Sequence, residues 1–505
     1  MKINLSLILF LAIQFSISNC HRSIQKINSS EMIIQPWPDN PHYLALGETP
    51  VFPLGPAGFH SWTPISRPEN IDFHEQFDRL AQVIEGIGSA HVCGFVRIIP
   101  YDPMNHDHDG AVKRVLQPWI KLEDGRYDLE QFSEEWEKRL RNYLSAAFQH
   151  RIVVSLEIWD DWSITRGLNG ASDPGENSAW NAHPFNPENN FNYDNSFLPV
   201  QTAHCNAPFY STIPSLDNNE KVLELQKRYV DKVLSIASEY PNIIINITNE
   251  SRAHLKWSRF WATYIRQRIP QTMMIGEMPS TNRKDSGGEC EYEFNPLTLC
   301  TDPLYDFVDI SQAVSTHEFG ADPKQQAIGG GEYILKYRQA MIMAETPRPL
   351  IVSKDYTRGP NGGDIILWGR FVSGAASARF HRLHFDHHDS VSQFQHDAVG
   401  RLGRFIAKVP FWRMHPTIDL VKELPSGAGI NVLAEPGHCY VVQLIGGDDN
   451  DKLQIDLPLG IWTVRWLDPA TGLELAFYEI NSNIEEVELD IPSGPDHRII
   501  LIERK

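Results

Sequence analysis

An apolar run near the middle of the chain ends in an amide and a carboxylate. Residues 242–250 read NIIINITNE, so Asn249 and Glu250 close a stretch suited to the interior of a protein. A carboxyl group backed by apolar residues has its pKa raised, as a general acid requires. Hydrolysis of a glycosidic bond uses two such carboxyl groups flanking the scissile bond. Glu250 is therefore the first candidate for this chemistry, and the structural alternative is that Asn249 and Glu250 only cap the next helix.

Other acidic side chains also stand where apolar runs end. The run LEIWDDW carries Glu157 and, between its two tryptophans, Asp160 and Asp161; Asp355 follows IVSK. Glu318 lies in the segment SQAVSTHEFG, after another apolar run. Asp160, Asp355 and Glu318 are the candidates for the second catalytic carboxylate. The structural alternative for each is a buried ion pair or an ordinary loop position.

Aromatic, basic and amide side chains that also lie near the ends of apolar runs are suited to binding a sugar. Aromatic faces stack on sugar rings, and polar side chains bind the hydroxyl groups. An arginine at such a place can also orient a catalytic carboxylate through a bidentate contact. The candidate substrate-binding residues are Asn249, Arg97, His60, Trp62, Glu157, Trp159, Trp162, Gln312, His317, Lys354 and His381.

Two segments rich in histidine and aspartate could be taken for metal sites. They read NHDHDG at residues 105–110 and HFDHHDS at residues 384–390. His and Asp are ligands of transition metals and calcium, but neither segment has a recognised ligand spacing. We therefore expect no metal and no cofactor. The absence of a GxSxG sequence also disfavours a serine hydrolase.

The elements that must position these side chains alternate along the chain. Apolar, β-branched runs are followed by stretches with apolar residues at i, i+3, i+4 and i+7. This alternation predicts a (β/α)8 barrel, in which active sites are built at the carboxyl ends of the strands. The eight strands are expected at residues 51–58, 91–100, 151–159, 242–250, 272–279, 305–314, 349–356 and 377–385. The helices are expected at residues 72–88, 129–150, 221–240, 254–269, 331–344 and 364–376, and none is expected after the fifth strand.

The pattern changes near Met414. From there to the last residue, apolar and polar residues alternate with period two and turn residues separate the runs, which predicts a small antiparallel β-sandwich. The expected organisation is a signal peptide at residues 1–20, a tether at 21–39, the barrel at 40–412 and the β-sandwich at 413–505.

The beginning of the sequence resembles an export signal. Lys2 precedes the apolar core LSLILFLAI, which is too short to span a bilayer as a mature helix. Cleavage could follow the small residues near position 18, or Cys20 could carry a lipid. We expect a secreted, periplasmic or lipid-anchored protein. In such an oxidising compartment, Cys290 and Cys300 could form a disulfide.

The formal net charge of the chain is −19. No basic stripe is present to meet phosphate groups, so a nucleic-acid partner is not expected. The expected partner is a carbohydrate substrate, and the only membrane attachment expected is through a lipid on Cys20.

Several stretches resemble known families. ITNE resembles the Asn-Glu signature of clan A glycoside hydrolases, in which the glutamate is the acid/base, and this resemblance assigns that role to Glu250. EIWDDW, HPFNPENNFNY, DISQ and SGAASARFHR are similar to a group of exported bacterial barrel proteins, over most of residues 40–412. The tail, with WTVRWLDPATGLE, resembles a small β-domain that bears the name of collagen-binding domain.

The sequence departs from the clan A pattern at the seventh strand. Clan A enzymes place a nucleophilic glutamate there, whereas this chain reads PLIVSKDYTRG. Either Asp355 substitutes for it, or the partner comes from another strand, such as Asp160 or Glu318.

The expected function is hydrolysis of glycosidic bonds in a plant or algal polysaccharide or its oligosaccharides. One alternative is a non-catalytic carbohydrate-binding surface protein, which the missing glutamate favours. The other is a polysaccharide lyase with Lys354, Tyr356 or His381 as its base.

Overall fold

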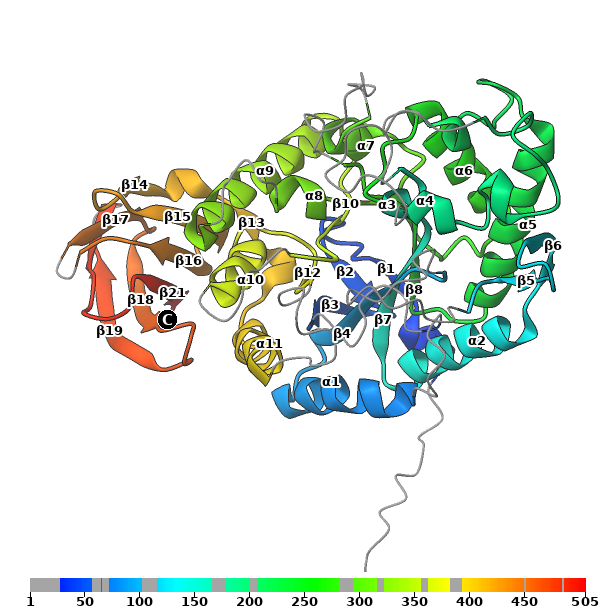
Figure 1. Ribbon diagram of the computed structural model, residues 1–505. Helices are drawn as coiled ribbons and strands as arrows, with labels where there is room; N and C mark the ends of the chain where they lie inside the picture. The colour runs from blue at the N-terminus through cyan, green and yellow to red at the C-terminus, as the bar shows by residue number, and fades with distance from the viewer. Residues whose placement is uncertain are drawn as a thin grey trace, which may run out of the picture.

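The computed structural model describes a barrel of parallel strands ringed by helices and followed by antiparallel sheets (Figure 1). The described residues are 28–56, 65, 72–101, 116–165, 179–199, 207–280, 294–315, 322–355, 362–381, 393–448, 451–483 and 486–505. In these ranges, none of the helices combines the length and the apolar character needed to cross a membrane.

Parallel strands form the closed ring of the barrel. They are β3 (Thr49–Gly55), β4 (Val92–Ile98), β7 (Ile152–Asp160), β8 (Ile243–Asn249), β9 (Ile275–Glu277), β10 (Phe307–Asp309), β11 (Leu350–Ile351) and β12 (Ala378–Arg379). Neighbours pair in chain order from β3 to β11, and β12 pairs in parallel with β3. A bridge between Asp355 and Phe380 joins the last two members of the ring. Six of the eight strands lie inside the ranges that the sequence predicts, while β3 begins two residues before its range and β7 ends one residue after its range. The predicted (β/α)8 fold is confirmed.

The close approach of β3 and β4 depends on Gly55. A Cβ atom at Gly55 would lie 1.9 Å from the carbonyl oxygen of Phe95, and a backbone atom cannot move aside as a flexible side chain can. We therefore expect Gly55→Ala to lower the free energy of unfolding by about 1–3 kcal/mol or more, as measured by urea denaturation.

A matched glycine on α1 (Phe73–Ile87) provides the control for that substitution. Gly86 has nothing within 4 Å of a built Cβ. Gly86→Ala should stabilise the protein by about 0.5–1 kcal/mol because alanine is the better helix former. Equal responses of the two variants would contradict the steric argument.

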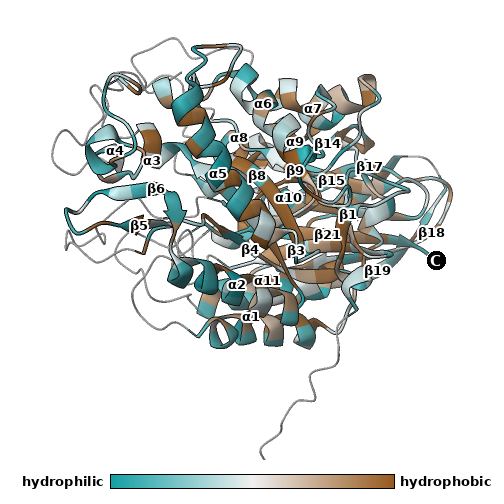
Figure 2. Cartoon of the chain, turned by 90° about the vertical axis from the view of Figure 1, so that its right-hand side faces the viewer, coloured by the Kyte–Doolittle hydropathy of each residue, from teal (hydrophilic) through white to brown (hydrophobic). Residues whose placement is uncertain are grey.

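Helices cover the outside of the ring, with hydrophilic residues on their outer surfaces and hydrophobic residues toward the strands (Figure 2). Asp72, Ser133 and Asn219 each accept a hydrogen bond from a first-turn N–H group and so fix where three of the helices begin. The longer helices are α1, α2 (Glu134–Gln149), α5 (Glu220–Ala237), α6 (Leu255–Arg266), α9 (Pro323–Met343), α10 (Gly363–Val372) and α11 (Gln393–Ile406). The short ones are α3 (Asp161–Thr165), α4 (Ala179–Ala182), α7 (Pro296–Thr301) and α8 (Ser311–Val314).

The helix prediction differs from the structure in several places, among them α11, α7, the start of α9 and residues 129–132. The sequence does not predict α11, whose glycines are weak helix formers. A Cβ atom at Gly403 would lie only 2.3 Å from Cδ1 of Ile87, so this glycine lets α11 pack closely against α1. The short α7 follows the fifth strand, where no helix is expected. Residues 129–132, which the spacing assigns to a helix, instead belong to β6 (Tyr127–Phe132), which pairs with β5 (Trp119–Lys121).

The barrel interior changes from apolar to polar along the strands. One apolar cluster contains residues of several successive barrel strands. It also contains residues of the hairpin strands β1 (Ile34–Pro36) and β2 (Leu44–Leu46). It includes Ile34, Leu44, Val51, Phe95, Val153, Ile244, Phe307 and Ile351. Two residues further along their strands lie the buried polar residues Arg97, Ser155, Asn246, Asp309 and Ser353. Polar chemistry is thereby confined to the carboxyl ends of the strands.

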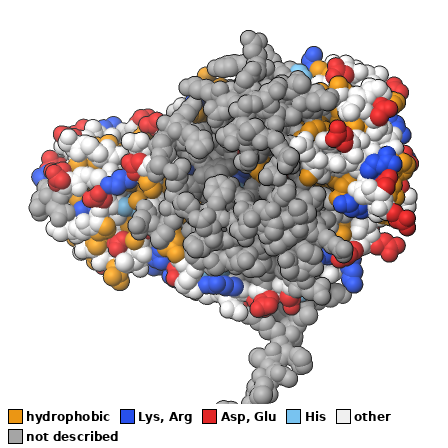
Figure 3. Space-filling view, in the orientation of Figure 1, with side chains coloured by type: hydrophobic (Ala, Val, Ile, Leu, Met, Phe, Trp, Pro, Cys, Tyr) orange, Lys and Arg blue, Asp and Glu red, His pale blue; other side chains and the backbone are white. Residues whose placement is uncertain are grey.

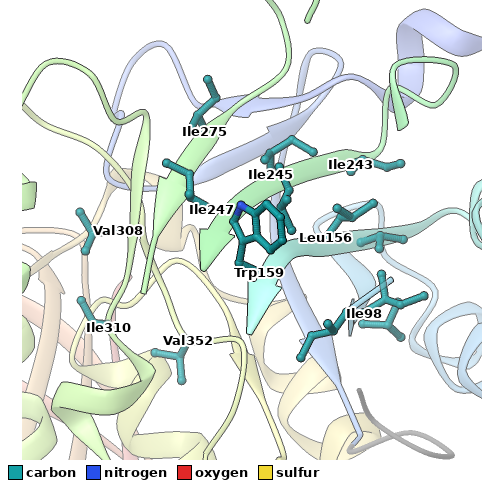
Figure 4. Packing of buried hydrophobic residues seen from close by; sticks show 14 of the residues in the cluster. Ile98, Leu156, Trp159, Ile243, Ile245, Ile247, Ile275, Val308, Ile310 and Val352 are labelled. Carbon is teal, nitrogen blue, oxygen red and sulfur yellow. The ribbon is translucent and has the colours of Figure 1, made fainter. Parts of the chain in front are cut away.

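A second apolar layer lies between the strands and the helices. Figure 4 shows its side chains on neighbouring strands, among them Ile98, Leu156, Ile245 and Ile275. The layer holds β8 rigidly in place, because its isoleucines are fully or almost fully buried.

The C-terminal part is a sandwich of two antiparallel sheets. The larger sheet has the order β13 (His415–Pro416), β15 (Gly429–Glu435), β16 (Cys439–Ile445), β21 (His497–Arg504), β18 (Gly460–Leu467) and β19 (Glu474–Ser482). The smaller sheet has the order β14 (Val421–Glu423), β17 (Lys452–Asp456) and β20 (Glu486–Asp490). A separate apolar cluster that includes Trp462, Trp466, Ile455 and Leu489 draws on both sheets.

The larger sheet also packs against the barrel. Leu433, Val441 and Leu501 belong to the main apolar cluster of the barrel. The side chain of Asn431 donates to the backbone carbonyl of Ala327 on α9 at 3.3 Å. The β-sandwich is therefore joined to the helices of the barrel by apolar and polar contacts.

The outer surface carries both signs of charge. Figure 3 shows acidic and basic side chains interspersed over the described surface of the β-sandwich and of the opposite flank of the barrel. The described part of this face therefore presents no single continuous electrostatic field.

Candidate active site

Glu250 stands at the mouth of the barrel, directly after β8. Its φ angle is 54°, in the left-handed region that costs energy for a residue with a side chain. The backbone is fixed immediately afterwards, because the N–H group of Ser251 donates to the carbonyl of Met278 at 2.8 Å. Strained backbone conformations of this kind concentrate at functional sites.

The side chain of Glu250 is held by residues that follow the sixth and seventh strands. Nζ of Lys354, which follows β11, forms an ion pair with Oε1 of Glu250. Nε2 of Gln312, on α8, donates to the same oxygen at 3.1 Å. The carboxylate therefore points across the barrel mouth and not outward among the helices. The side chain of Glu250 is 18% exposed, whereas that of Lys354 is 1% exposed.

Asn249 links these groups to a second carboxyl group. Its Oδ1 accepts from Nζ of Lys354 at 2.7 Å and from Nη2 of Arg97 at 3.1 Å. Its Nδ2 donates to Oδ1 of Asp160, at the end of β7, at 2.7 Å. Two cationic donors on one end fix the orientation of the amide, so the other end can only donate.

Asp160 is a buried carboxyl group that can carry a proton near neutral pH. Burial raises the pKa of Asp160 to about 7, although the hydrogen bond from Asn249 opposes the shift. The negative charges of Glu250 and Glu157 add to the rise. The backbone N–H of Asp160 donates to the hydroxyl of Tyr101 at 3.1 Å, which holds the end of β7 in place.

A buried ion pair lies beside Asn249. Nη2 of Arg97 binds Oε2 of Glu157, and both side chains are inaccessible to solvent. The same nitrogen of Arg97 also donates to Asn249, so Arg97 contacts two polar groups of the site. Its role in orienting a catalytic carboxylate stays a prediction. Burial raises the pKa of Glu157 even though Arg97 opposes the shift.

Asp355 follows Lys354 but has different partners. Its Oδ1 accepts from Nε of Arg370 on α10 at 2.9 Å and from the hydroxyl of Ser315 at 3.0 Å. Both side chains of the Asp355–Arg370 pair are fully buried. The backbone N–H of His381, itself buried, donates to the carbonyl of Asp355 at 3.0 Å. Of the two residues that follow the seventh strand, Lys354 therefore contacts Glu250 and Asp355 contacts Arg370.

The prediction that Trp159 stacks on a sugar is wrong. Trp159 is fully buried, and its ring packs against Tyr229 and Phe209 with centroids 4.8 and 5.2 Å apart. Its neighbours come from the layer between strands and helices, where Figure 4 shows it. The sequence could not show on which side of β7 this ring lies. Trp162, on α3, is only partly buried.

Several sequence candidates lie outside the described residues. They are Glu318, His60, Trp62, His317, Tyr356 and the two histidine- and aspartate-rich segments. Within the described ranges, no group of three or more His, Cys, Asp or Glu side chains is arranged to hold a metal. Cys300 is a buried free thiol, and its predicted partner Cys290 lies outside the described residues.

Sequence reasoning did not single out Asp309, at the end of β10. Asp309 is fully buried and accepts from the N–H and hydroxyl groups of Ser311 at 3.0 and 2.6 Å. Asn246 of β8 donates to it at 3.5 Å. The signal that could have found it is an acidic residue inside the predicted sixth strand, at the start of the stretch DISQ.

Glu277, at the end of β9, is a buried carboxyl group whose titration can be measured. Burial raises the pKa of Glu277 to about 8, although the hydroxyl of Ser258 donates to it at 2.7 Å. Between about pH 4.5 and 8, the folded chain keeps this proton while the unfolded chain loses it. The free energy of unfolding therefore falls as pH rises through this window, by at most about 1.4 kcal/mol per unit.

We expect Glu277→Gln to remove that dependence. Urea denaturation at a series of pH values should show the variant gaining stability relative to the parent protein between pH 4.5 and 8. A constant difference across this window would contradict a raised pKa for Glu277.

The site thus combines three carboxyl groups with two cations at the carboxyl ends of parallel strands. The carboxyl groups are Glu157, Asp160 and Glu250, and the cations are Arg97 and Lys354. One of the carboxylates pairs with an ammonium group, and another holds a proton near neutral pH. Such a difference between two neighbouring carboxyl groups suits acid and base roles in one reaction.

The (β/α)8 barrel with its C-terminal antiparallel sheets is a fold that solved structures of glycoside hydrolases share. The chain is similar to a glycoside hydrolase family 5 structure from Bacteroides vulgatus, with a TM-score of 0.60 at 10% identity over 95% of this chain and 94% of that one. It is also similar to a structure described as a glycoside hydrolase, with a TM-score of 0.58 at 10% identity over 95% of this chain and 98% of that one. No protein-family model matches the sequence. No curated protein matches it either. At this identity, the likeness establishes the shared fold alone.

Proposed function

We infer that this protein is a glycoside hydrolase that works with two carboxyl groups at the barrel mouth, Glu250 and Asp160. The observation that carries this proposal is the chain of contacts from Glu250 through Lys354 and Asn249 to Asp160. It gives one carboxyl group a cationic partner and leaves the other easily protonated. The similarity of the fold to glycoside hydrolases supports the same conclusion.

Asp160 suits the role of second carboxyl group better than Asp355. The side-chain amide of Asn249, the residue before Glu250, donates a hydrogen bond to Asp160. Asp355 instead binds Arg370. Glu318 lies outside the described residues, and so its role stays a prediction.

The substrate and location are further parts of the proposal. We propose that the protein is exported and acts on a plant or algal polysaccharide or its oligosaccharides. The support is the N-terminal signal-like sequence, with Cys20 as the site of a lipid in the anchored form, and the resemblance to exported barrel proteins.

A substrate panel tests the proposed activity. The full chain is incubated with neutral and uronic-acid polysaccharides of plants and algae and with their oligosaccharides. We expect new reducing ends without ultraviolet absorbance, because hydrolysis makes no double bond. Absorbing products would instead show a lyase. No product from any substrate would reject the proposal.

The ion pair of Lys354 with Glu250 favours a second candidate, a carbohydrate-binding protein. In such a protein, the ion pair of Lys354 with Glu250 would only stabilise the structure, and no two carboxylates would face each other across the substrate. The panel separates the two functions, because a binder would give a calorimetric binding signal with a polysaccharide but no reducing ends.

A further inference from the structure

We propose that Asp160, and not Glu250, donates the proton to the glycosidic oxygen, while Glu250 acts as the ionised partner. This inference rests on the proposed hydrolase function and reverses the roles that the clan A resemblance assigns. It follows from which groups surround each of the two carboxyl groups.

The surroundings of Glu250 stabilise its charged form. Lys354 places an ammonium group on Oε1, and the amide of Gln312 donates to the same atom. Burial lowers the pKa of Lys354, and the charge of Glu250 opposes that shift. Because the attraction is mutual, the same contact stabilises the carboxylate of Glu250. A group held ionised in this way is a poor proton donor.

The surroundings of Asp160 have the opposite effect. The residue is 2% exposed and receives one neutral hydrogen bond, from Asn249, in place of an ion pair. The negative charges of Glu250, directly after β8, and of Glu157, on β7, raise the pKa of Asp160, and the smaller effect of the charge of Lys354 opposes them. This geometry by itself favours the protonated form, and it agrees with the rise of the pKa of Asp160 to about 7.

Two tyrosines complete the surroundings of Asp160. Tyr101 lies three residues after the end of β4, and its hydroxyl accepts from the backbone N–H of Asp160. Tyr210 lies beside Asp161, whose carboxylate accepts from the Tyr210 hydroxyl at 2.8 Å. The pKa of each tyrosine is raised by burial and by nearby aspartates, so both remain neutral in the range where Asp160 titrates. They supply no positive charge that would ionise Asp160.

The reaction balances with these roles. The proton of Asp160 passes to the glycosidic oxygen, which keeps the electron pair of the breaking bond to the anomeric carbon. The oxygen of a water molecule bonds to that carbon, and its proton passes to the carboxylate of Glu250. The two carboxyl groups exchange protons with solvent before the next turnover.

Substrates that differ in their leaving group distinguish the two assignments. The probe is the 2,4-dinitrophenyl glycoside of the sugar that the unmodified protein releases, because this leaving group needs no protonation. Asp160→Asn should lose about 10²–10⁴-fold in kcat/KM on the polysaccharide but stay within about 10-fold on the probe. Glu250→Gln should lose activity on both. The reverse pattern overturns the proposal.

Infrared difference spectra test the resting protonation without a substrate. At pH 6, the C=O band of a protonated carboxyl group should be lost in Asp160→Asn and kept in Glu250→Gln. A band lost only in Glu250→Gln would overturn the assignment and leave the hydrolase function standing. Absence of hydrolysis by the unmodified protein would reject both the function and the division of roles.

Discussion

Glu250→Gln is expected to lower kcat/KM on the substrate by about 10²–10⁴-fold, the contribution of a positioned acid or base. Glutamine has nearly the same shape, and its carbonyl oxygen can still accept from Lys354 and Gln312, which contact Oε1 of the native side chain. The substitution therefore removes the charge and the titratable proton while keeping the contacts. Steady-state kinetics on the best substrate of the panel measure the loss.

A matched control separates this effect from a general change of charge. Glu332 lies exposed on α9, and Glu332→Gln should leave kcat/KM unchanged. Thermal denaturation then checks that Glu250→Gln still folds, since Lys354 is almost inaccessible and loses its charged partner. A folded Glu250→Gln variant with near-native activity would reject the assignment of Glu250 to the chemistry.

The place of Glu250 could be predicted because it depends on strong local signals. An isoleucine-rich run predicts a buried strand, and the carboxyl ends of barrel strands all meet at one mouth. These two facts place Asn249, Glu250 and Asp160 near one another before any coordinates are seen. The same signals predict the eight barrel strands, since each strand is a compact apolar run.

The partners of these side chains could not be predicted in the same way. Lys354 and Asp355 are adjacent in sequence, and nothing local shows that one binds Glu250 while the other binds Arg370. The direction of Trp159 is equally undetermined, because it depends on how the end of β7 is packed between α5 and α6. Such contacts join residues far apart in the chain, and they exist only once the barrel has closed.

The buried pair of Asp355 and Arg370 is expected to matter for stability. Arg370→Met should lower the free energy of unfolding by about 3–5 kcal/mol, because it leaves the carboxylate of Asp355 buried without its charged partner. The double substitution Arg370→Met, Asp355→Leu should recover much of that loss, since it removes both charges. Urea denaturation measures both changes. As a control, Arg126→Met breaks an exposed pair with Asp124 and should leave stability unchanged within error.

The activity of the Asp355 variants decides whether this residue is also a nucleophile. If Asp355 serves only to hold Arg370 and the end of the seventh strand, Asp355→Asn should be less stable but keep kcat/KM within about 10-fold at a temperature where it is folded, well short of the 10²–10⁴-fold effect of a catalytic acid or base. Its amide can still accept from Arg370 and Ser315, which bind Oδ1 of the native side chain. A folded Asp355→Asn variant that loses activity as fully as Glu250→Gln would show that Asp355 takes part in the reaction. Asp355 would then be the attacking group, and Arg370 would keep it ionised.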